Sequence, residues 1–234
     1  MITVFGGTPQ FGLADFSPAC LKVKTYLRMR EIPYESKQGM PQKGPTKKIP
    51  YVRFDDGAIV GDSELIIGAI HERFGNPLDA HLTNEQHALG HVIRRTLEEN
   101  LYWVTVLARW RHDAAYVRMK RVFSGMLPPV IGPLIMRSIR KGSLANAWGQ
   151  GLGRHKDDHV WAAGKADLDA VAIFVGEKPF LFGDSPTTYD AAIYGQIANA
   201  FAPEFDNPLS AYAKTHRTLR AYCERITARY FPPV

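Results

Sequence analysis

Apolar and polar positions along the first 75 residues change period several times, which is typical of a chain that alternates short strands with helices. Short runs rich in β-branched and aromatic residues predict strands at 2–5, 33–36, 51–54 and 58–60. Apolar residues at helical spacing predict helices at 17–30 and 62–74.

The first predicted helix begins at Ser17-Pro18. A serine oxygen accepts a hydrogen bond from a first-turn N–H, and proline suits the first helical position because an N–H there would be unpaired anyway. We therefore expect the Ser17 side chain to cap this helix and to leave a polar hydroxyl at the helix mouth.

From residue 83 onward the pattern is helical. Residues 83–86 read Thr-Asn-Glu-Gln, which is a capping box, and an apolar stripe continues to about residue 108. A proline-rich stretch at 126–133 breaks the pattern, and we expect 142–153 to be loose. Further helices are expected at 156–176, 187–200 and 208–229, the last with a break near Ala213.

The order strand-helix-strand followed by strand-strand-helix is the one that a thioredoxin-like domain requires. We predict an α/β thioredoxin-like domain at 1–75, a linker at 76–82 and an all-α helical-bundle domain at 83–234. At 45% apolar and 22% charged residues, the chain is long enough and apolar enough to bury a core.

Four short segments then resemble the glutathione S-transferase superfamily. Residues 17–20, Ser-Pro-Ala-Cys, stand where thioredoxin-fold proteins carry Cys-x-x-Cys, and residues 49–52, Ile-Pro-Tyr-Val, look like the segment with that fold's cis-proline. Residues 61–66 resemble the acidic-Ser pair at the next helix start, and 182–190 are similar to the Thr-x-x-Asp box of the superfamily's helical domain. Residues 16–29 and 152–155 look most like the branch that contains metaxins and failed-axon-connections proteins.

The resemblance implies a glutathione site built from three pieces. Ser17 would donate a hydrogen bond to the thiolate, and the backbone of Ile49, turned by a cis Pro50, would pair with the cysteinyl backbone. Ser63 and the free N–H groups beside it would hold the γ-glutamyl carboxylate, Asp62 would pair with the adjacent ammonium, and Lys48 would reach the glycyl carboxylate. Each piece also has a plain interpretation: Ser17 and Asp62-Ser63 as helix caps, Pro50 as trans, and Lys48 as a solvated surface lysine.

Cys20 lies where the resolving cysteine of a redox pair would sit, but Ser17 occupies the attacking position. A hydroxyl forms no mixed disulfide, so we expect Cys20 to be a small buried apolar residue. The electrophile pocket is expected late on the first long helix. Its candidate residues are Tyr102, Trp103, Arg109, Trp110 and Tyr116.

The net charge of +6 is concentrated in one segment, because residues 109–141 hold eight Lys or Arg and a single acid, Asp113. Four interpretations stay open for it: a solvated helix face, an anionic substrate, an acidic membrane surface, and nucleic acid, for which no aromatic-basic motif argues. The longest apolar window, 126–136, is far shorter than the roughly 20 residues of a membrane span. With two cysteines, no zinc-ligand spacing and no targeting signal, we expect a cytoplasmic protein without a metal.

The predicted function is conjugation of glutathione, as co-substrate, to a small electrophile through a Ser17-stabilised thiolate. A homodimer and a peripheral membrane contact stay open, and nucleic acid is not expected as a partner. The alternative from another class is a non-catalytic, metaxin-like interaction or membrane-associated scaffold. A third interpretation is a thiol transferase that uses Cys20.

Overall fold

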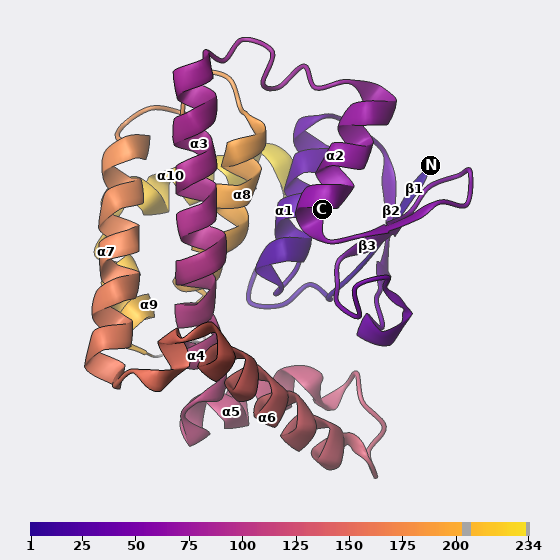
Figure 1. Ribbon diagram of the computed structural model, residues 1–234, viewed down its shortest axis with the longest axis vertical. Coiled ribbons are helices and arrows are strands. Elements are labelled where there is room, and N and C mark those ends of the chain that lie inside the picture. The colour runs from indigo at the N-terminus through magenta and orange to yellow at the C-terminus, as the bar shows by residue number, and fades with distance from the viewer. Residues whose placement is uncertain (203–206, 233–234) are drawn as a thin grey trace.

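The computed structural model describes residues 1–202 and 207–232. Its first part is a small mixed sheet with two helices (Figure 1). The elements in chain order are β1 (Ile2–Gly6), α1 (Pro18–Met29), β2 (Tyr34–Gln38), β3 (Tyr51–Arg53), β4 (Ile59–Gly61) and α2 (Ser63–Phe74). Each lies within two residues of its predicted bounds, and one 3₁₀ turn, Pro41–Lys43, lies in the loop before β3.

The four strands form one sheet in the order β2-β1-β3-β4. β1 pairs with β2 in parallel and with β3 antiparallel, and β4 pairs antiparallel with β3. Helices α1 and α2 stand between this sheet and the helical part of the molecule (Figure 1). The mouths of both helices therefore lie near the boundary between the two parts.

The second part of the molecule is helical. Its helices are α3 (Asn84–Thr96), α4 (Tyr102–Trp110), α5 (Asp113–Ser124), α6 (Gly132–Gln150), α7 (Asp157–Val175), α8 (Thr188–Ile197), α9 (Pro208–Ala213) and α10 (Arg217–Tyr230). A π-helical segment, Leu97–Leu101, joins α3 to α4, so the predicted long helix is continuous but contains one wider, underwound turn. The 3₁₀ turns Leu152–Arg154 and Ala198–Phe201 complete the described elements.

The prediction that 142–153 would be loose is wrong over most of its length. α6 continues to Gln150, and its end is set by Gly151, whose φ is 116°. Gly142 and Gly149 lie inside the helix, where each costs roughly 1 kcal/mol relative to alanine. The buried side chains of Met136 and Ala147 pack this helix onto the core, and tertiary packing overrides the local propensity.

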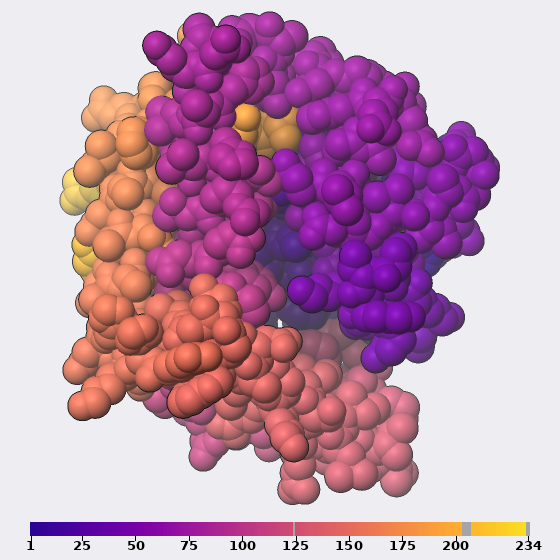
Figure 2. Space-filling view, viewed as in Figure 1, coloured from indigo at the N-terminus to yellow at the C-terminus, as the bar shows by residue number. Residues whose placement is uncertain are grey.

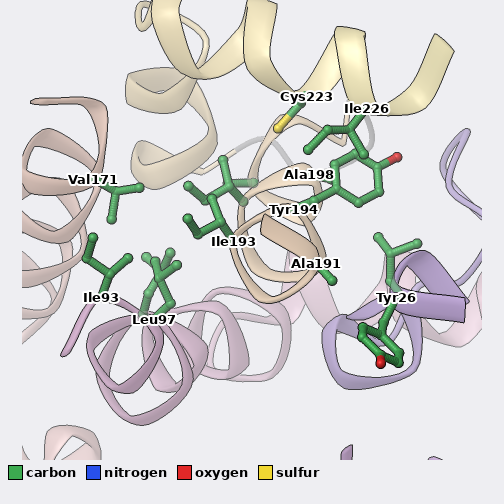
Figure 3. Close-up of a cluster of buried hydrophobic side chains, with 14 of the residues drawn as sticks. Tyr26, Ile93, Leu97, Val171, Ala191, Ile193, Tyr194, Ala198, Cys223 and Ile226 are labelled. Atoms are coloured by element: carbon green, nitrogen blue, oxygen red, sulfur yellow. The ribbon is translucent and has the colours of Figure 1, made fainter. Parts of the chain in front are cut away.

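α8 is the centre of the helical core. In Figure 3, Ile193 points toward Leu97 and Val171, while Tyr194 lies on the other side of the helix beside Ile226 of α10. Each of these side chains is at most 1% exposed. The same helix packs against α1, and this contact joins the two parts of the molecule.

Gly195 allows α8 and α1 to approach closely. A Cβ at this position would lie 2.7 Å from the Pro18 carbonyl oxygen and 3.0 Å from the Lys22 nitrogen. A side chain here would push α8 away from the start of α1, so the absence of one fixes the helix mouth against the helical core.

The predicted box at the start of α8 is present and buried. An Asp190 carboxylate oxygen accepts from the Thr187 N–H at 2.8 Å and from the Thr187 hydroxyl at 2.6 Å. The other oxygen accepts from the Leu181 N–H and from the Tyr222 hydroxyl. Burial raises the pKa of Asp190, and these hydrogen bonds act against the rise.

Across the described residues, no helix combines the length and the apolar character that crossing a membrane requires.

Candidate functional site

Ser17 lies at the mouth of α1, in the N-cap position, with extended backbone angles of φ −87° and ψ 120°. Its side chain makes no capping hydrogen bond, which corrects the expectation that it would. Instead, its backbone N–H donates to Asp15 Oδ1 at 3.0 Å. Asp15 therefore fixes the chain as it enters the helix, and the hydroxyl of Ser17 is not used by the helix end.

A buried ion pair supports this loop from behind. Asp15 is fully buried, Lys24 is 3% exposed, and Lys24 Nζ lies 2.8 Å from Asp15 Oδ2. Lys24 also donates to the Ala14 carbonyl at 3.2 Å. Burial raises the pKa of Asp15, and the positive charge of Lys24 acts against that rise.

A cavity of about 480 Å³ opens beside Ser17, between the sheet domain and the helices. On the face that Figure 2 shows, the surface is hollowed here, and N-terminal residues lie at the base of the hollow. The cavity brings together residues from three separate segments that the sequence singled out. They are Ser17, Lys48, Ile49, Pro50, Asp62 and Ser63.

The peptide bond between Ile49 and Pro50 is cis, as the resemblance implied. It lies directly before β3, at the wall of the cavity.

At the mouth of α2, Asp62 and not Ser63 is the N-cap. Asp62 Oδ1 accepts from the N–H groups of Glu64 at 2.9 Å and Leu65 at 3.4 Å. Its φ is 76°, an unusual value for a residue other than glycine. Ser63 is the first helical residue, so its side chain and N–H are at the helix end and face the cavity region.

Between the two helix mouths lies a cluster of four charged side chains. Lys22, only 2% exposed, contacts Glu64 at 2.8 Å and Glu98 at 2.6 Å. Arg94 contacts Glu64 at 2.6 Å and Glu98 at 3.5 Å. Burial acts to raise the pKa of Glu64, but the charges of Lys22 and Arg94 outweigh it and the pKa is lowered. This cluster ties α1, α2 and the π-helical segment together and so fixes the distance between the two mouths.

A second, more apolar cavity of about 340 Å³ adjoins the first. Both cavities are lined by Ser17, Lys48, Ile49 and Tyr102, so these residues lie where the two meet. Of the predicted electrophile-pocket residues, Trp103, Arg109 and Trp110 also line this second cavity.

Tyr116 is not among the described residues that line either cavity. Its ring packs against Trp110 and against the guanidinium of Arg140, which lies 4.5 Å from the ring centre.

Arg109 is a buried cation in the wall of the second cavity. It donates to the carbonyl of Phe16 at 3.2 Å and to Asn199 Oδ1. Burial lowers the pKa of Arg109 to about 10, so it is still protonated at neutral pH. Burial also raises the pKa of Tyr102, with the charge of Arg109 acting against the rise.

Cys20 is fully buried, as expected. Burial raises the pKa of its thiol and the negative charge of Asp15 adds to this, whereas a hydrogen bond with the side chain of Ser17 acts to lower it. Since the thiolate is the reactive form, this position disfavours chemistry at Cys20.

The sequence analysis did not identify several residues of the polar cavity. They are Thr46, Arg94, Arg95, Glu98, Glu99 and Gln196. All but Thr46 lie on helical segments that reach the cavity only because of tertiary packing. They were missed because charged residues on a helix usually face solvent. A usable signal was the pair Lys22 and Lys24, since two lysines within an otherwise apolar helix imply buried carboxylate partners.

A small mixed sheet, a following helical domain, and a cavity between them at two helix mouths define the glutathione S-transferase fold class. The chain belongs to the glutathione S-transferase family: the model for "Glutathione S-transferase N-terminal domain" matches residues 18–115, and that for "Glutathione S-transferase, C-terminal domain" matches residues 164–226.

Curated relatives agree with this assignment. Isoprene-epoxide–glutathione S-transferase of Rhodococcus sp. is 34% identical, over 98% of this chain and 99% of that protein. Failed axon connections of Drosophila melanogaster is 28% identical over 83% of this chain, which spans only 48% of that longer protein. Metaxin-1 of Mus musculus is 25% identical over 95% of this chain and 73% of its own length.

Solved structures share the fold. A glutathione transferase from Phanerochaete chrysosporium superposes with a TM-score of 0.67 at 15% identity, covering 100% of this chain and 98% of that one. A glutathione S-transferase of Ceriporiopsis subvermispora in complex with glutathione has the same TM-score and identity, covering 99% and 98%.

Proposed function

We propose that this protein is a glutathione transferase that joins glutathione to a small electrophile through a thiolate held by Ser17. The observation that carries the proposal is the position of Ser17, at a helix mouth where a polar cavity and an apolar cavity meet. A thiol bound on one side and an electrophile bound on the other would then react at this hydroxyl.

Glutathione binds in the polar cavity in this proposal. The mouth of α2, with the hydroxyl and the N–H of Ser63, receives the γ-glutamyl carboxylate, because helix N-termini favour anions. The N–H groups of Glu64 and Leu65 donate to Asp62. Asp62 pairs with the neighbouring ammonium, the backbone of Ile49 pairs with the cysteinyl part, and Lys48 contacts the glycyl carboxylate. The charged cluster around Lys22 and Glu64 supports this arrangement by holding the two helix mouths in place.

The protein's contribution to the reaction is to lower the pKa of the bound thiol and to orient it. The Ser17 hydroxyl donates to the sulfur, and the mouth of α1 adds roughly 0.3–1 kcal/mol in favour of the anion. The Ser17 side chain is suited to this role because it makes no capping hydrogen bond within the helix.

The name of the Rhodococcus relative points to an epoxide as the electrophile. Sulfur would form a bond to an epoxide carbon while the C–O bond breaks, and the resulting alkoxide would take a proton. Tyr102 lines both cavities, and its raised pKa keeps its hydroxyl protonated until a stronger base forms. We propose Tyr102 as the donor of this proton, which water then restores, and the cation of Arg109 favours the transient phenolate.

A titration calorimetry experiment with glutathione tests the first step. We expect binding with micromolar to millimolar affinity, roughly −4 to −8 kcal/mol. Conjugation of a small terminal epoxide, followed by loss of the glutathione thiol, tests the second step. Absence of heat with glutathione at millimolar concentration would remove the transferase proposal.

The second candidate function is a scaffold with a ligand groove that performs no chemistry. The similarity to failed axon connections and to metaxin-1 supports it, since neither of these relatives is named as a transferase. Glutathione binding without conjugation of any electrophile tested would favour this candidate.

We also propose a cytoplasmic homodimer. The two cysteines are both unpaired and buried, which supports a reducing compartment. Leu65 and Val92 expose 62% and 59% of their surfaces, which supports burial against a second copy. Sedimentation velocity of the wild type and of Leu65→Asp tests the dimer, and a monomeric wild type contradicts it.

A further inference from the structure

Helices α5 and α6 form a hairpin that projects from the end of the molecule (Figure 1). The apolar residues at its tip, in the loop between the two helices and the first turns of α6, are exposed: Val130 by 88%, Leu134 by 63% and Ile131 by 49%. Pro128, Pro129 and Pro133 around them are exposed as well. We name residues 128–134 the apolar tip.

The apolar tip is not needed to hold the hairpin together. Met119 of α5 and Met136 of α6 are 1% and 3% exposed, and they form a small core with Val106 and Trp110 of α4. Arg140 fastens the base of the hairpin by donating to the carbonyls of Trp110 and Arg111, each at 2.8 Å. The hairpin thus packs against α4 through this small core, and its exposed apolar side chains are not part of the core.

Positive charge lies on the two helices that the apolar tip connects. Residues 114–156 contain no Asp or Glu. Lys120 of α5 and Arg137 and Lys141 of α6 are exposed, and none of them is among the described lining residues of the two cavities. An anionic substrate in those cavities therefore does not account for these charges, and a merely solvated helix face does not account for the exposed apolar tip beside them.

We propose that the α5–α6 hairpin docks on an anionic lipid bilayer, with the apolar tip inserted among the headgroups and Lys120, Arg137 and Lys141 contacting lipid phosphates and carboxylates. A projecting apolar tip between two helices that carry exposed cations matches such a surface in both shape and charge. Each cation near an anionic membrane raises partition by roughly fivefold.

Docking has a consequence for the site, which rests on the proposed function. Phe123, Met126 and Ile139 of the same hairpin line the apolar cavity. A docked hairpin therefore places that cavity beside the bilayer, where apolar electrophiles concentrate.

Vesicle flotation tests the proposal with the full chain and two vesicle types, phosphatidylcholine alone and phosphatidylcholine with phosphatidylserine. We expect flotation with the anionic vesicles only, and its loss at high salt because surface charges are screened within a Debye length. No binding to anionic vesicles, or equal binding to both types, overturns the proposal. Salt-sensitive binding to an RNA or to an acidic protein, with no binding to vesicles, overturns it as well.

Matched variants locate the surface. Val130→Asp with Leu134→Asp is expected to reduce partition at least tenfold, whereas Ile173→Asp, on α7 and 79% exposed, leaves it unchanged.

Replacing Lys120, Arg137 and Lys141 by Gln is expected to reduce partition by roughly a hundredfold. The matched control replaces Lys178, Lys214 and Arg217, all exposed and far along the chain, by Gln. Equal effects of hairpin and control variants contradict the proposal.

Conjugation in vesicle-free solution separates this inference from the proposed function. The hairpin variants are expected to keep wild-type kcat/KM there with a water-soluble electrophile, because none of the changed residues is among the described lining residues of the polar or the apolar cavity. A protein that conjugates but does not float would retain the proposed function and lose this inference.

Discussion

The buried ion pair of Asp15 and Lys24 supports the loop that carries Ser17, and breaking this pair gives a testable prediction. Replacing Lys24 by Met keeps a long, flexible side chain and removes its charge. Asp15 then remains fully buried, with hydrogen bonds from the backbone N–H groups of Ser17, at 3.0 Å, and of Gly7. A buried carboxylate that loses its cation is strongly destabilising.

The expected cost at pH 7 to 8 is about 3–5 kcal/mol of unfolding free energy, the range for breaking a buried ion pair. Asp15→Asn together with Lys24→Met is expected to cost much less than Lys24→Met alone. The amide oxygen still accepts from the N–H of Ser17, and no charge is left buried. These variants belong to a double-mutant cycle, in which the interaction between Asp15 and Lys24 is expected to be stabilising.

The cost also depends on pH. Burial already raises the pKa of Asp15, and removing the positive charge of Lys24 raises it further. A carboxyl group with a higher pKa in the folded than in the unfolded protein stabilises the fold most below its unfolded pKa of about 3.9. That contribution is lost as the pH rises through the folded pKa, so the deficit of Lys24→Met grows from acid to neutral pH.

Urea unfolding at several pH values between about 5 and 8 measures this deficit. Lys37→Met is a suitable control, because Lys37 is 46% exposed in its pair with Glu35. A deficit of Lys24→Met that does not change with pH, or a double variant as unstable as Lys24→Met, would refute the account of this pair.

Three further predictions address the site and the core. Ser63→Ala is expected to weaken glutathione binding by about 1–3 kcal/mol in calorimetry, because a bound carboxylate loses a donor; unchanged affinity would place that carboxylate elsewhere. Burial raises the pKa of Asp167 to about 6, with the amide of Asn100 acting against it, so its ionisation destabilises the fold as the pH rises from about 4 to 6. Asp167→Asn is therefore expected to add about 1 kcal/mol to the free energy of unfolding at pH 8 and nothing near pH 4, after allowance for solvent screening. The same gain at both pH values would argue against the raised pKa of Asp167. Gly195→Ala is expected to lower stability by about 1–3 kcal/mol in thermal unfolding, since its Cβ meets the backbone of α1; a neutral effect would mean that the two helices separate freely.

The sequence predicted the fold well because its local signals agree with its tertiary packing. Ser17-Pro18 does begin a helix, the bond before Pro50 is cis, and Asp190 does reach back to Thr187. These features depend on local chemistry, or they belong to motifs that the sequence shares with the glutathione S-transferase superfamily. The continuation of α6 through Gly142 was missed because the packing of Met136 and Ala147 decides it, and the core residues around Met136, such as Val106 and Trp110, belong to other helices.

The candidate site was predictable only in part, for the same reason. Residues next to helix starts and turns, such as Ser63 and Ile49, are placed by local structure, and the structure brings them to one cavity. The charged cluster of Lys22, Glu64 and Glu98 joins positions 42 and 76 residues apart. No local pattern in one sequence reports such a contact.

The central claim is that Ser17 stabilises the thiolate of bound glutathione. The most direct test is the ultraviolet thiolate absorbance of glutathione bound to the wild type and to Ser17→Ala, followed over pH. Because the Ser17 side chain makes no capping hydrogen bond, this variant is expected to unfold at nearly the wild-type temperature, with Ser138→Ala on α6 as control. The account predicts a largely ionised thiol at about pH 6.5 in the wild type, a raised thiol pKa in Ser17→Ala, and a kcat/KM lower by about 10- to 1000-fold. The same thiolate titration in both proteins would contradict it.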